Sequence, residues 1–190
     1  MKRAIFLDRD GVINKEKGYV HKIEDFEFEK NALRGLKEID FNKFLVFLIC
    51  NQAGIAKGFY STKDFKKLDS WLRDFLLKKG IKIQKTYFCP HHPEAEIKKY
   101  RKKCSCRKPE IGLLLRAKRE FNLDLKNSFF IGDKTCDILA GKRAGCKTIL
   151  VKTGYAGEDK LFCVEPDFKA KDLLEAVRLI KNIEKPKKLT

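Results

Sequence analysis

Two acidic pairs follow apolar runs in a pattern that can hold a metal ion beside a phosphate. Asp8 and Asp10 come directly after the run "AIFL", and Asp133 and Asp137 follow "SFFIG", with Lys134 between them. Carboxylates from two separate strands can share a hard divalent cation such as Mg²⁺, which commonly bridges protein carboxylates to phosphate. These residue types therefore indicate a site for phosphate chemistry.

The stretch "CPHHPEAEIKKYRKKCSCRKP" gathers three of the seven cysteines and two of the three histidines. Cys89 and His91 at its start, with Cys104 and Cys106 near its end, supply three thiolates and one imidazole. This closed set suits a tetrahedral structural Zn²⁺. His92 is a competing imidazole ligand, and a disulfide is the alternative use of the thiols.

Length and composition favour one globular domain. The chain has 190 residues, 43% of them hydrophobic and 11% aromatic, and its apolar runs are too short to span a membrane. The opening "MKRAIFLDRDG" has no signal-peptide pattern, so we expect a cytoplasmic protein, a monomer, with reduced thiols. We expect one domain over residues 1–183, with a zinc loop at 89–106, and a basic tail over 184–190.

The formal net charge of +17 favours binding of polyanions without choosing among them. A solvated lysine-rich surface is the simpler interpretation, because no aromatic ladder interleaves the basic residues. A zinc-dependent nucleic-acid-binding protein remains the alternative from a different functional class.

Short apolar runs alternate with amphipathic segments, which is typical of an α/β fold with an open parallel sheet. We expect helices over residues 62–80, with Thr62 as N-cap and Gly80 as the stop, and over 110–121 and 170–183. The expected strands are residues 4–8, 44–50, 85–89, 128–133 and 148–154. Ligands of such sheets bind at the carboxyl ends of the strands. Both acidic pairs lie there, as does the loop "NQAGIAKG", whose backbone N–H groups suit phosphate.

The motifs resemble those of a known family. "DRDGVIN" and "GDKTCD" are similar to the first and last signatures of the haloacid dehalogenase (HAD) superfamily of phosphatases. Together with "GYVHKIEDFEF", "NQAGIAKG", "CPHHP" and "CSCRKP", they resemble the bacterial D-glycero-D-manno-heptose 1,7-bisphosphate 7-phosphatase group, which includes histidinol-phosphatase relatives. The resemblance spans Ile5 to Gly154. It implies a Rossmann-like HAD sheet in which a small zinc loop replaces a large cap domain.

The resemblance also implies roles for individual residues. Asp8 would be the nucleophile that forms an aspartyl-phosphate, and Asp10 the general acid and base. Mg²⁺ would be held by Asp8, the backbone carbonyl of Asp10 and Asp133. Lys108 would neutralise charge on the transferring phosphoryl group. The substrate-binding residues would be Glu16, Lys17, Gly18, Tyr19, Asn51, Gln52, Ala53, Arg107 and Lys134.

Two details bear on specificity and rate. Family members carry Thr or Ser where this chain has Cys50, and a thiol is a weak hydrogen-bond donor, so Cys50 is either a poor phosphate ligand or a buried strand residue. The family's Cys-x-His pattern selects His91 over His92 as the zinc ligand. Arg107 would hold a second anionic group, which favours a heptose bisphosphate over histidinol phosphate.

Overall fold

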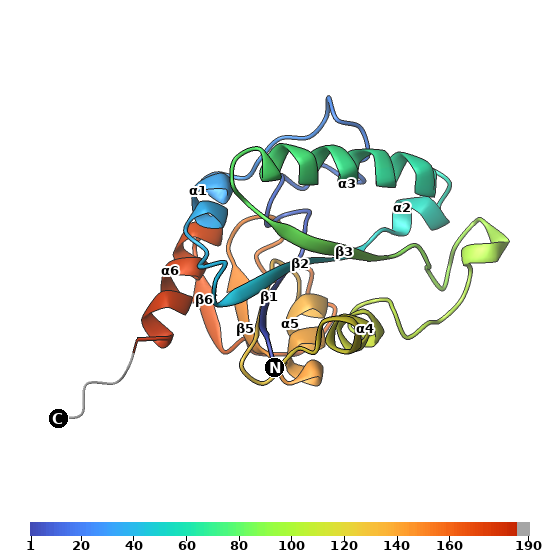
Figure 1. Cartoon of the computed structure of the whole chain (residues 1–190). Helices are drawn as coiled ribbons and strands as arrows, with labels where there is room; N and C mark the ends of the chain where they lie inside the picture. Colours follow the sequence, from blue (N-terminus) through green and yellow to red (C-terminus); the bar gives the residue numbers. More distant parts are fainter. Residues whose placement is uncertain (186–190) are drawn as a thin grey trace.

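A parallel sheet of six strands runs through the middle of the molecule (Figure 1). The structure is a computed structural model of the chain and describes residues 1–185. The strands lie in the order β3-β2-β1-β4-β5-β6, and every neighbouring pair is parallel. Their bounds are β1 Arg3–Leu7, β2 Phe44–Asn51, β3 Ile83–Cys89, β4 Phe129–Gly132, β5 Lys147–Val151 and β6 Phe168–Ala170. The expected open parallel sheet is confirmed.

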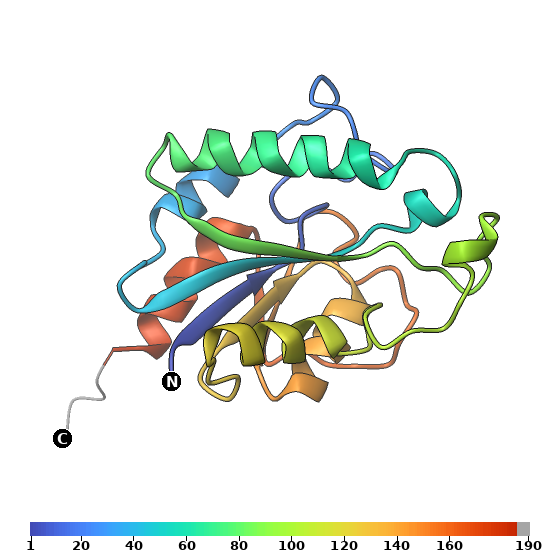
Figure 2. The ribbon, with the colours of Figure 1, turned by 45° about the vertical axis from the view of Figure 1, so that its right-hand side comes forward.

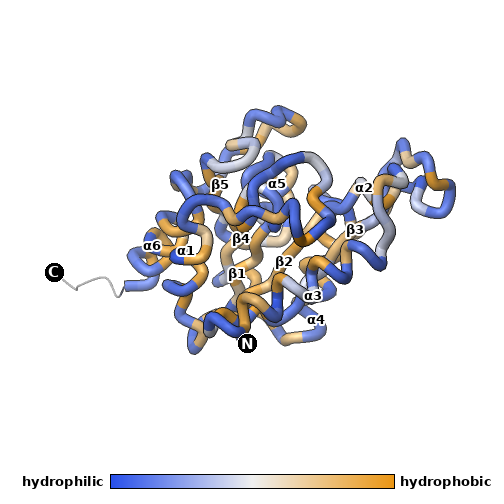
Figure 3. Tube along the Cα trace, turned by 90° about the horizontal axis from the view of Figure 1, so that it is seen from above, coloured by the Kyte–Doolittle hydropathy of each residue, from blue (hydrophilic) through white to orange (hydrophobic). Residues whose placement is uncertain are grey.

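Helices cover both faces of this sheet. α1, α3 and α6 enclose one core cluster, and α4 and α5 enclose the other; Figure 2 shows α3 and α4 on opposite sides of the strands. The helices are α1 Ala32–Lys37, α2 Ala53–Ala56, α3 Thr62–Leu77, α4 Gly112–Phe121, α5 Thr135–Ala144 and α6 Leu173–Ile183. The central strands are hydrophobic in Figure 3 because they are buried on both faces.

The three predicted helices and five predicted strands are present with shifted ends, whereas α1, α2, α5 and β6 were not predicted. α1, α2 and β6 are too short to show a clear period. α5 is buried around most of its surface, including Asp137, so it lacks the amphipathic stripe by which a helix is recognised in sequence. The helix that carries Asp137 was therefore not recognisable from periodicity.

The prediction of Thr62 as the N-cap of α3 was wrong. Ser61 is the cap, and its hydroxyl accepts a hydrogen bond from the backbone N–H of Asp64. The Asp64 carboxylate accepts one in return from the Ser61 N–H, which completes a capping box. Gly80, in the left-handed conformation at φ 76°, follows the end of the helix as expected.

The connection from β3 to α4 protrudes from one end of the sheet (Figure 1). It contains a single 3₁₀ turn, Lys98–Tyr100, and residues 1–185 include no large cap domain. Within the same range, no helix is long and apolar enough to cross a membrane. Of the predicted tail, residues 186–190 lie outside the described residues, and the division at residue 183 stays a prediction.

Candidate active site

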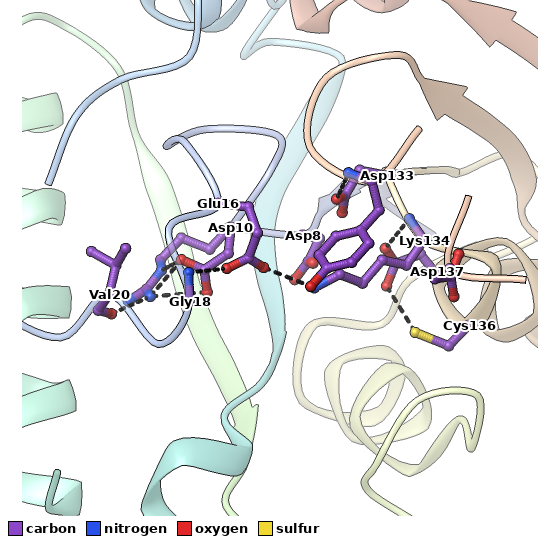
Figure 4. A network of polar contacts seen from close by, with 12 residues as sticks. Asp8, Asp10, Glu16, Gly18, Val20, Asp133, Lys134, Cys136 and Asp137 are labelled. Carbon is purple, nitrogen blue, oxygen red and sulfur yellow. Dashed lines mark hydrogen bonds and ion pairs between the residues drawn. The ribbon is translucent and has the colours of Figure 1, made fainter. Parts of the chain in front are cut away.

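Three buried carboxylates meet at the carboxyl edge of the sheet (Figure 4). Asp8 follows β1, Asp133 follows β4, and Asp137 lies in the first turn of α5. One carboxylate oxygen from each lies within 4.8 Å of the others. β1 and β4 are neighbours in the sheet, so their ends deliver these residues to one place. Asp137 is the third member of this acidic group. Of the three, only Asp8 and Asp133 were predicted from the sequence as metal ligands.

Electrostatics make this acidic centre suitable for a cation. Burial and the charge of Asp137 raise the pKa of Asp8 to about 6, although Lys108 opposes them. Burial, Asp137 and Asp8 also raise the pKa of Asp133 well above its usual range. The Asp133 Oδ1 atom is buried without a hydrogen-bond partner. A hard divalent cation with oxygen ligands fits this unpaired oxygen and the crowded negative charge.

Lys108 is the cation that the structure already places among these carboxylates. Its Nζ lies 2.9 Å from Asp8 Oδ1 and 2.7 Å from Asp137 Oδ1, and it donates to the Ile49 carbonyl oxygen at 2.6 Å. Burial acts to lower the pKa of Lys108, but the two carboxylates raise it well above the ordinary value. Lys108 therefore stays charged although its side chain is 1% exposed.

Asn51 fixes the backbone of Lys108. The Asn51 Nδ2 donates to the Lys108 carbonyl oxygen and the Asn51 Oδ1 accepts from the Lys108 N–H, both at 3.0 Å. The next residue, Gln52, donates its backbone N–H to the carbonyl oxygen of Cys89 at 2.9 Å. Both residues line the cavity beside Asp8. The Asn51 side chain and the Gln52 N–H nevertheless already form hydrogen bonds with the protein backbone.

Asp10 is held by a fully buried arginine that the sequence reading missed. Arg9 Nη2 lies 2.7 and 2.9 Å from the two carboxylate oxygens of Asp10, which also accepts from Asn14 and Gln52. Burial acts to raise the pKa of Asp10, but the Arg9 guanidinium outweighs it and lowers that pKa. Tyr60 donates to the Gln52 side chain at 2.6 Å and so supports the arrangement. A single Arg between two aspartates gave no signal in the sequence by which to recognise this role.

The loop around Tyr19 closes one side of the site. Glu16 pairs with Lys134 at 2.9 Å and accepts the Gly18 N–H at 2.9 Å. Tyr19 has a left-handed backbone, φ 60°, and accepts a hydrogen bond from Lys57. Of the predicted segment, Lys17 does not line the cavity, and it pairs with Glu27 instead.

These groups surround a cavity of about 380 Å³. Its lining includes Asp8, Asp10 and Lys108 together with the predicted Glu16, Gly18, Tyr19, Asn51, Gln52, Ala53, Arg107 and Lys134. It also includes residues that were not predicted, namely Tyr60, Cys136, Asp137, Tyr155, Asp159 and Leu161. Cys50 is fully buried in β2 among core side chains and is not part of the lining.

The four predicted zinc ligands form a second cluster. The three sulfurs of Cys89, Cys104 and Cys106 lie 3.1 to 3.5 Å apart, and His91 Nδ1 lies 3.3 Å from Cys106 Sγ. Zn–S bonds of about 2.3 Å put the sulfurs of a tetrahedral site roughly 3.8 Å apart. The four ligand atoms are therefore gathered closely enough for one ion, and the thiolates would move a little apart to bind it. All seven cysteines are free, so the disulfide alternative finds no support. His92 lies outside this group.

The cysteine cluster adjoins the active site through the chain and through hydrogen bonds. Lys108 follows Cys106 by two residues, and Arg107 between them donates to the His91 carbonyl oxygen at 3.2 Å. The carbonyl of Cys89 accepts the Gln52 N–H. The conformation of residues 89–106 therefore determines where the two cations Arg107 and Lys108 lie.

Comparisons with known proteins agree with this geometry. A model of the HAD-hydrolase-like family matches residues 105–176. The chain is 46% identical to the D-glycero-alpha-D-manno-heptose-1,7-bisphosphate 7-phosphatase of Photorhabdus laumondii, over 80% of this chain and 84% of that protein. It is 45% identical to the beta-anomer enzyme of Pasteurella multocida, over 81% and 84%. The crystal structure of the D,D-heptose 1,7-bisphosphate phosphatase from B. bronchiseptica, complexed with magnesium and phosphate, has a TM-score of 0.84 and 26% identity, covering 96% of this chain and 99% of that one.

The fold and the acidic centre together are those of a hydrolase of the HAD superfamily. Because the curated relatives are phosphatases, the protein is a phosphoric monoester hydrolase. Within that superfamily, the chain belongs to the D-glycero-D-manno-heptose-1,7-bisphosphate 7-phosphatase family. The resemblance inferred from the motifs is confirmed.

Two glycines make room for Asp133, which gives a test of the acidic centre. A Cβ on Gly154 would lie 2.2 Å from Asp133 Oδ2, and one on Gly11 would lie 2.3 Å from it. We expect Gly154→Ala to displace this carboxylate and to lower phosphatase activity by more than about tenfold. Steady-state assays at saturating Mg²⁺ measure the loss.

Gly145→Ala is the matched control. Gly145 also has a left-handed backbone, φ 80°, but a Cβ there meets nothing within 4 Å. Both variants should lose about 1 kcal/mol of unfolding free energy from backbone strain, and only Gly154→Ala should lose activity. Equal activity in the two variants would show that Asp133 needs no such fixed position.

Proposed function

We propose that the enzyme is a Mg²⁺-dependent phosphatase that removes the 7-phosphate of D-glycero-D-manno-heptose 1,7-bisphosphate. The observation that carries the proposal is the buried Lys108 between Asp8 and Asp137, at the edge where Asp133 also lies. Nucleophilic carboxylate, cation and acidic metal site are the components of phosphoryl transfer. The proposed substrate is that of the related phosphatases, among which enzymes for both anomers occur.

The chemistry proposed for this chain divides between two aspartates. Asp8 attacks phosphorus in line, the bond from phosphorus to the sugar oxygen breaks, and an aspartyl-phosphate forms. Asp10, which lines the same cavity, donates a proton to the departing oxygen and later accepts one from the water that cleaves the intermediate. Because the ion pair with Arg9 lowers its pKa, this role requires that substrate binding weaken that pair and that Asp10 take up a proton first. Lys108 lies 2.9 Å from Asp8 and neutralises charge on the transferring group.

Asp8, the backbone carbonyl of Asp10 and Asp133 are the proposed Mg²⁺ ligands. When bound, the ion reduces the repulsion between the Asp8 carboxylate and the phosphate dianion. The unpaired Asp133 Oδ1 supports its assignment as a ligand. Asp137 serves differently in this proposal, since its Oδ1 pairs with Lys108 and its Oδ2 accepts the Lys134 N–H at 3.1 Å.

Arg107 is the reason for preferring a bisphosphate over histidinol phosphate. It lines the catalytic cavity and also a neighbouring cavity of about 850 Å³, so its guanidinium can meet an anion at the far end of a substrate. Histidinol phosphate carries no second phosphate. The nucleic-acid alternative rests on the net charge and on the basic residues of the zinc loop. We further infer a cytoplasmic location, because free thiols such as those of this chain persist in reducing compartments.

The central test is Asp8→Asn, because an amide can neither attack phosphorus nor supply negative charge to the metal. We expect turnover of the heptose bisphosphate to fall by at least about a thousandfold while the protein stays folded, as circular dichroism would show. Asp74→Asn, an exposed residue on α3, should behave as wild type. Substantial activity in Asp8→Asn would refute the nucleophile assignment. A panel with histidinol phosphate and other sugar phosphates tests the substrate.

The cysteine cluster predicts about one Zn²⁺ per chain in purified protein. Cys106→Ser should lose the metal, and thermal stability and activity should fall together, because binding energy at such a site also orders the loop. Cys163→Ser changes an exposed free cysteine outside the cluster and should alter neither property. Full activity in a folded, zinc-free protein would show that the metal does not position Lys108.

Arg107→Ala distinguishes a bisphosphate substrate from a monophosphate. Loss of a charge-assisted contact should cost about 2 kcal/mol in kcat/KM, roughly thirtyfold, for the bisphosphate. The 7-monophosphate of the same sugar should lose far less, since Lys108 still faces its only phosphate. Arg119→Ala, an exposed residue on α4, is the control. Equal losses for the bisphosphate and the monophosphate would place Arg107 at the scissile group or in the scaffold.

A further inference from the structure

The loop after β5, residues 153–162, forms a wall of the catalytic cavity to which the sequence motifs assign no role. Tyr155, Asp159 and Leu161 from this loop line that cavity. Tyr155 is 45% exposed and Leu161 is 68% exposed, so both present apolar surface to the solvent-filled site instead of the core. Large exposed apolar side chains at the rim of a cavity indicate contact with a ligand.

The backbone of this loop is held in an uncommon conformation. Ala156 at φ 54° and Lys160 at φ 48° lie in the left-handed region although neither is glycine, alongside Gly154 and Gly157. Side chains with a Cβ adopt this region only when the surroundings determine it, and such strain is concentrated at functional sites.

Hydrogen bonds to the acidic loops impose that conformation. The N–H groups of Tyr155 and Gly157 donate to the Oδ2 and the carbonyl oxygen of Asp133, at 2.8 and 2.7 Å. The Asp159 carboxylate accepts from both the N–H and the hydroxyl of Thr135, at 2.8 and 2.7 Å, at the start of α5. The wall is therefore fixed to the residues on either side of Lys134.

The Tyr155 ring lies against the ammonium group of Lys134. Lys134 Nζ lies 4.4 Å from the ring centroid and pairs with Glu16 at 2.9 Å. Figure 4 shows Lys134 beside Asp133 and Asp137, with its side chain reaching toward Glu16. Tyr155 and Asp8 line the same cavity, so the ring can contact the part of a substrate that lies away from a phosphate at Asp8.

We propose that Tyr155 and Leu161 are specificity-determining residues that recognise the sugar portion of the substrate, with Asp159 as the positioning residue of the wall. An amphipathic ring packs well against the C–H face of a polyol while its hydroxyl remains wet. This rests on the proposed sugar phosphatase activity. The wall contributes to binding of the sugar and not to the attack on phosphorus.

The test compares a sugar phosphate with acetyl phosphate, which can react at Asp8 but has no sugar. In Tyr155→Ala, the ratio of kcat/KM for the heptose bisphosphate to that for acetyl phosphate should fall about tenfold, mainly through a higher KM for the sugar. Tyr155→Phe retains the ring and should restore the ratio to within about twofold of wild type. Leu161→Ser should lower the ratio in the same direction, and the protein should stay folded because Leu161 is exposed and not part of the core. Leu115→Ala, an exposed residue on α4, should leave the ratio unchanged.

Equal losses on both substrates in Tyr155→Ala and Leu161→Ser would overturn the proposal, because a merely structural wall would affect all turnover alike. If the wild-type enzyme hydrolyses a different sugar phosphate, only the proposed substrate fails, and the same comparison is made with that sugar. Hydrolysis of acetyl phosphate without any sugar phosphate would overturn both.

Discussion

The site depends on keeping the ammonium of Lys108 charged in a place that excludes water. A buried ion is costly unless opposite charges and hydrogen bonds compensate it, and here Asp8, Asp137 and the Ile49 carbonyl do so within 2.9 Å. These partners come from β1, α5 and β2, so correct pairing requires that the sheet be complete. Asp8 and Asp137 also bring negative charge close to Asp133, and this excess of negative charge favours a bound metal ion.

Rigid placement of Lys108 comes from the end of β2 and from the connection that follows β3. The β3–α4 connection is long and contains only one short turn, so hydrophobic packing alone gives it little support. Its four-residue cysteine and histidine cluster and the two hydrogen bonds from Asn51 supply the missing constraints. In this arrangement a structural metal would do the work that packing does elsewhere in the core.

The acidic loops and the loop after β5 likewise stabilise one another. Asp133 accepts hydrogen bonds from Tyr155 and Gly157, and Gly154 passes so close that no side chain fits. A change in the backbone of this loop, such as a side chain at Gly154, therefore acts on the proposed metal ligand directly. The side chains of Tyr155 and Leu161 line the cavity and take no part in these backbone contacts.

The sequence by itself was enough to predict the parallel sheet and the edge of the sheet that carries the site. It was also enough to select Asp8, Asp10, Asp133 and the cysteine cluster as candidate site residues. It did so because apolar strands end on chemically distinctive residues, and those signals are local in the chain. Only the tertiary structure showed that Asp137 binds Lys108, that Arg9 holds Asp10, and that Lys17 faces away. These facts depend on which side chains from distant segments meet in a buried space, and neither periodicity nor spacing encodes that. The wall at Tyr155 was missed for the same reason, since its conformation is imposed by hydrogen bonds to Asp133 and Thr135 and not by its own sequence.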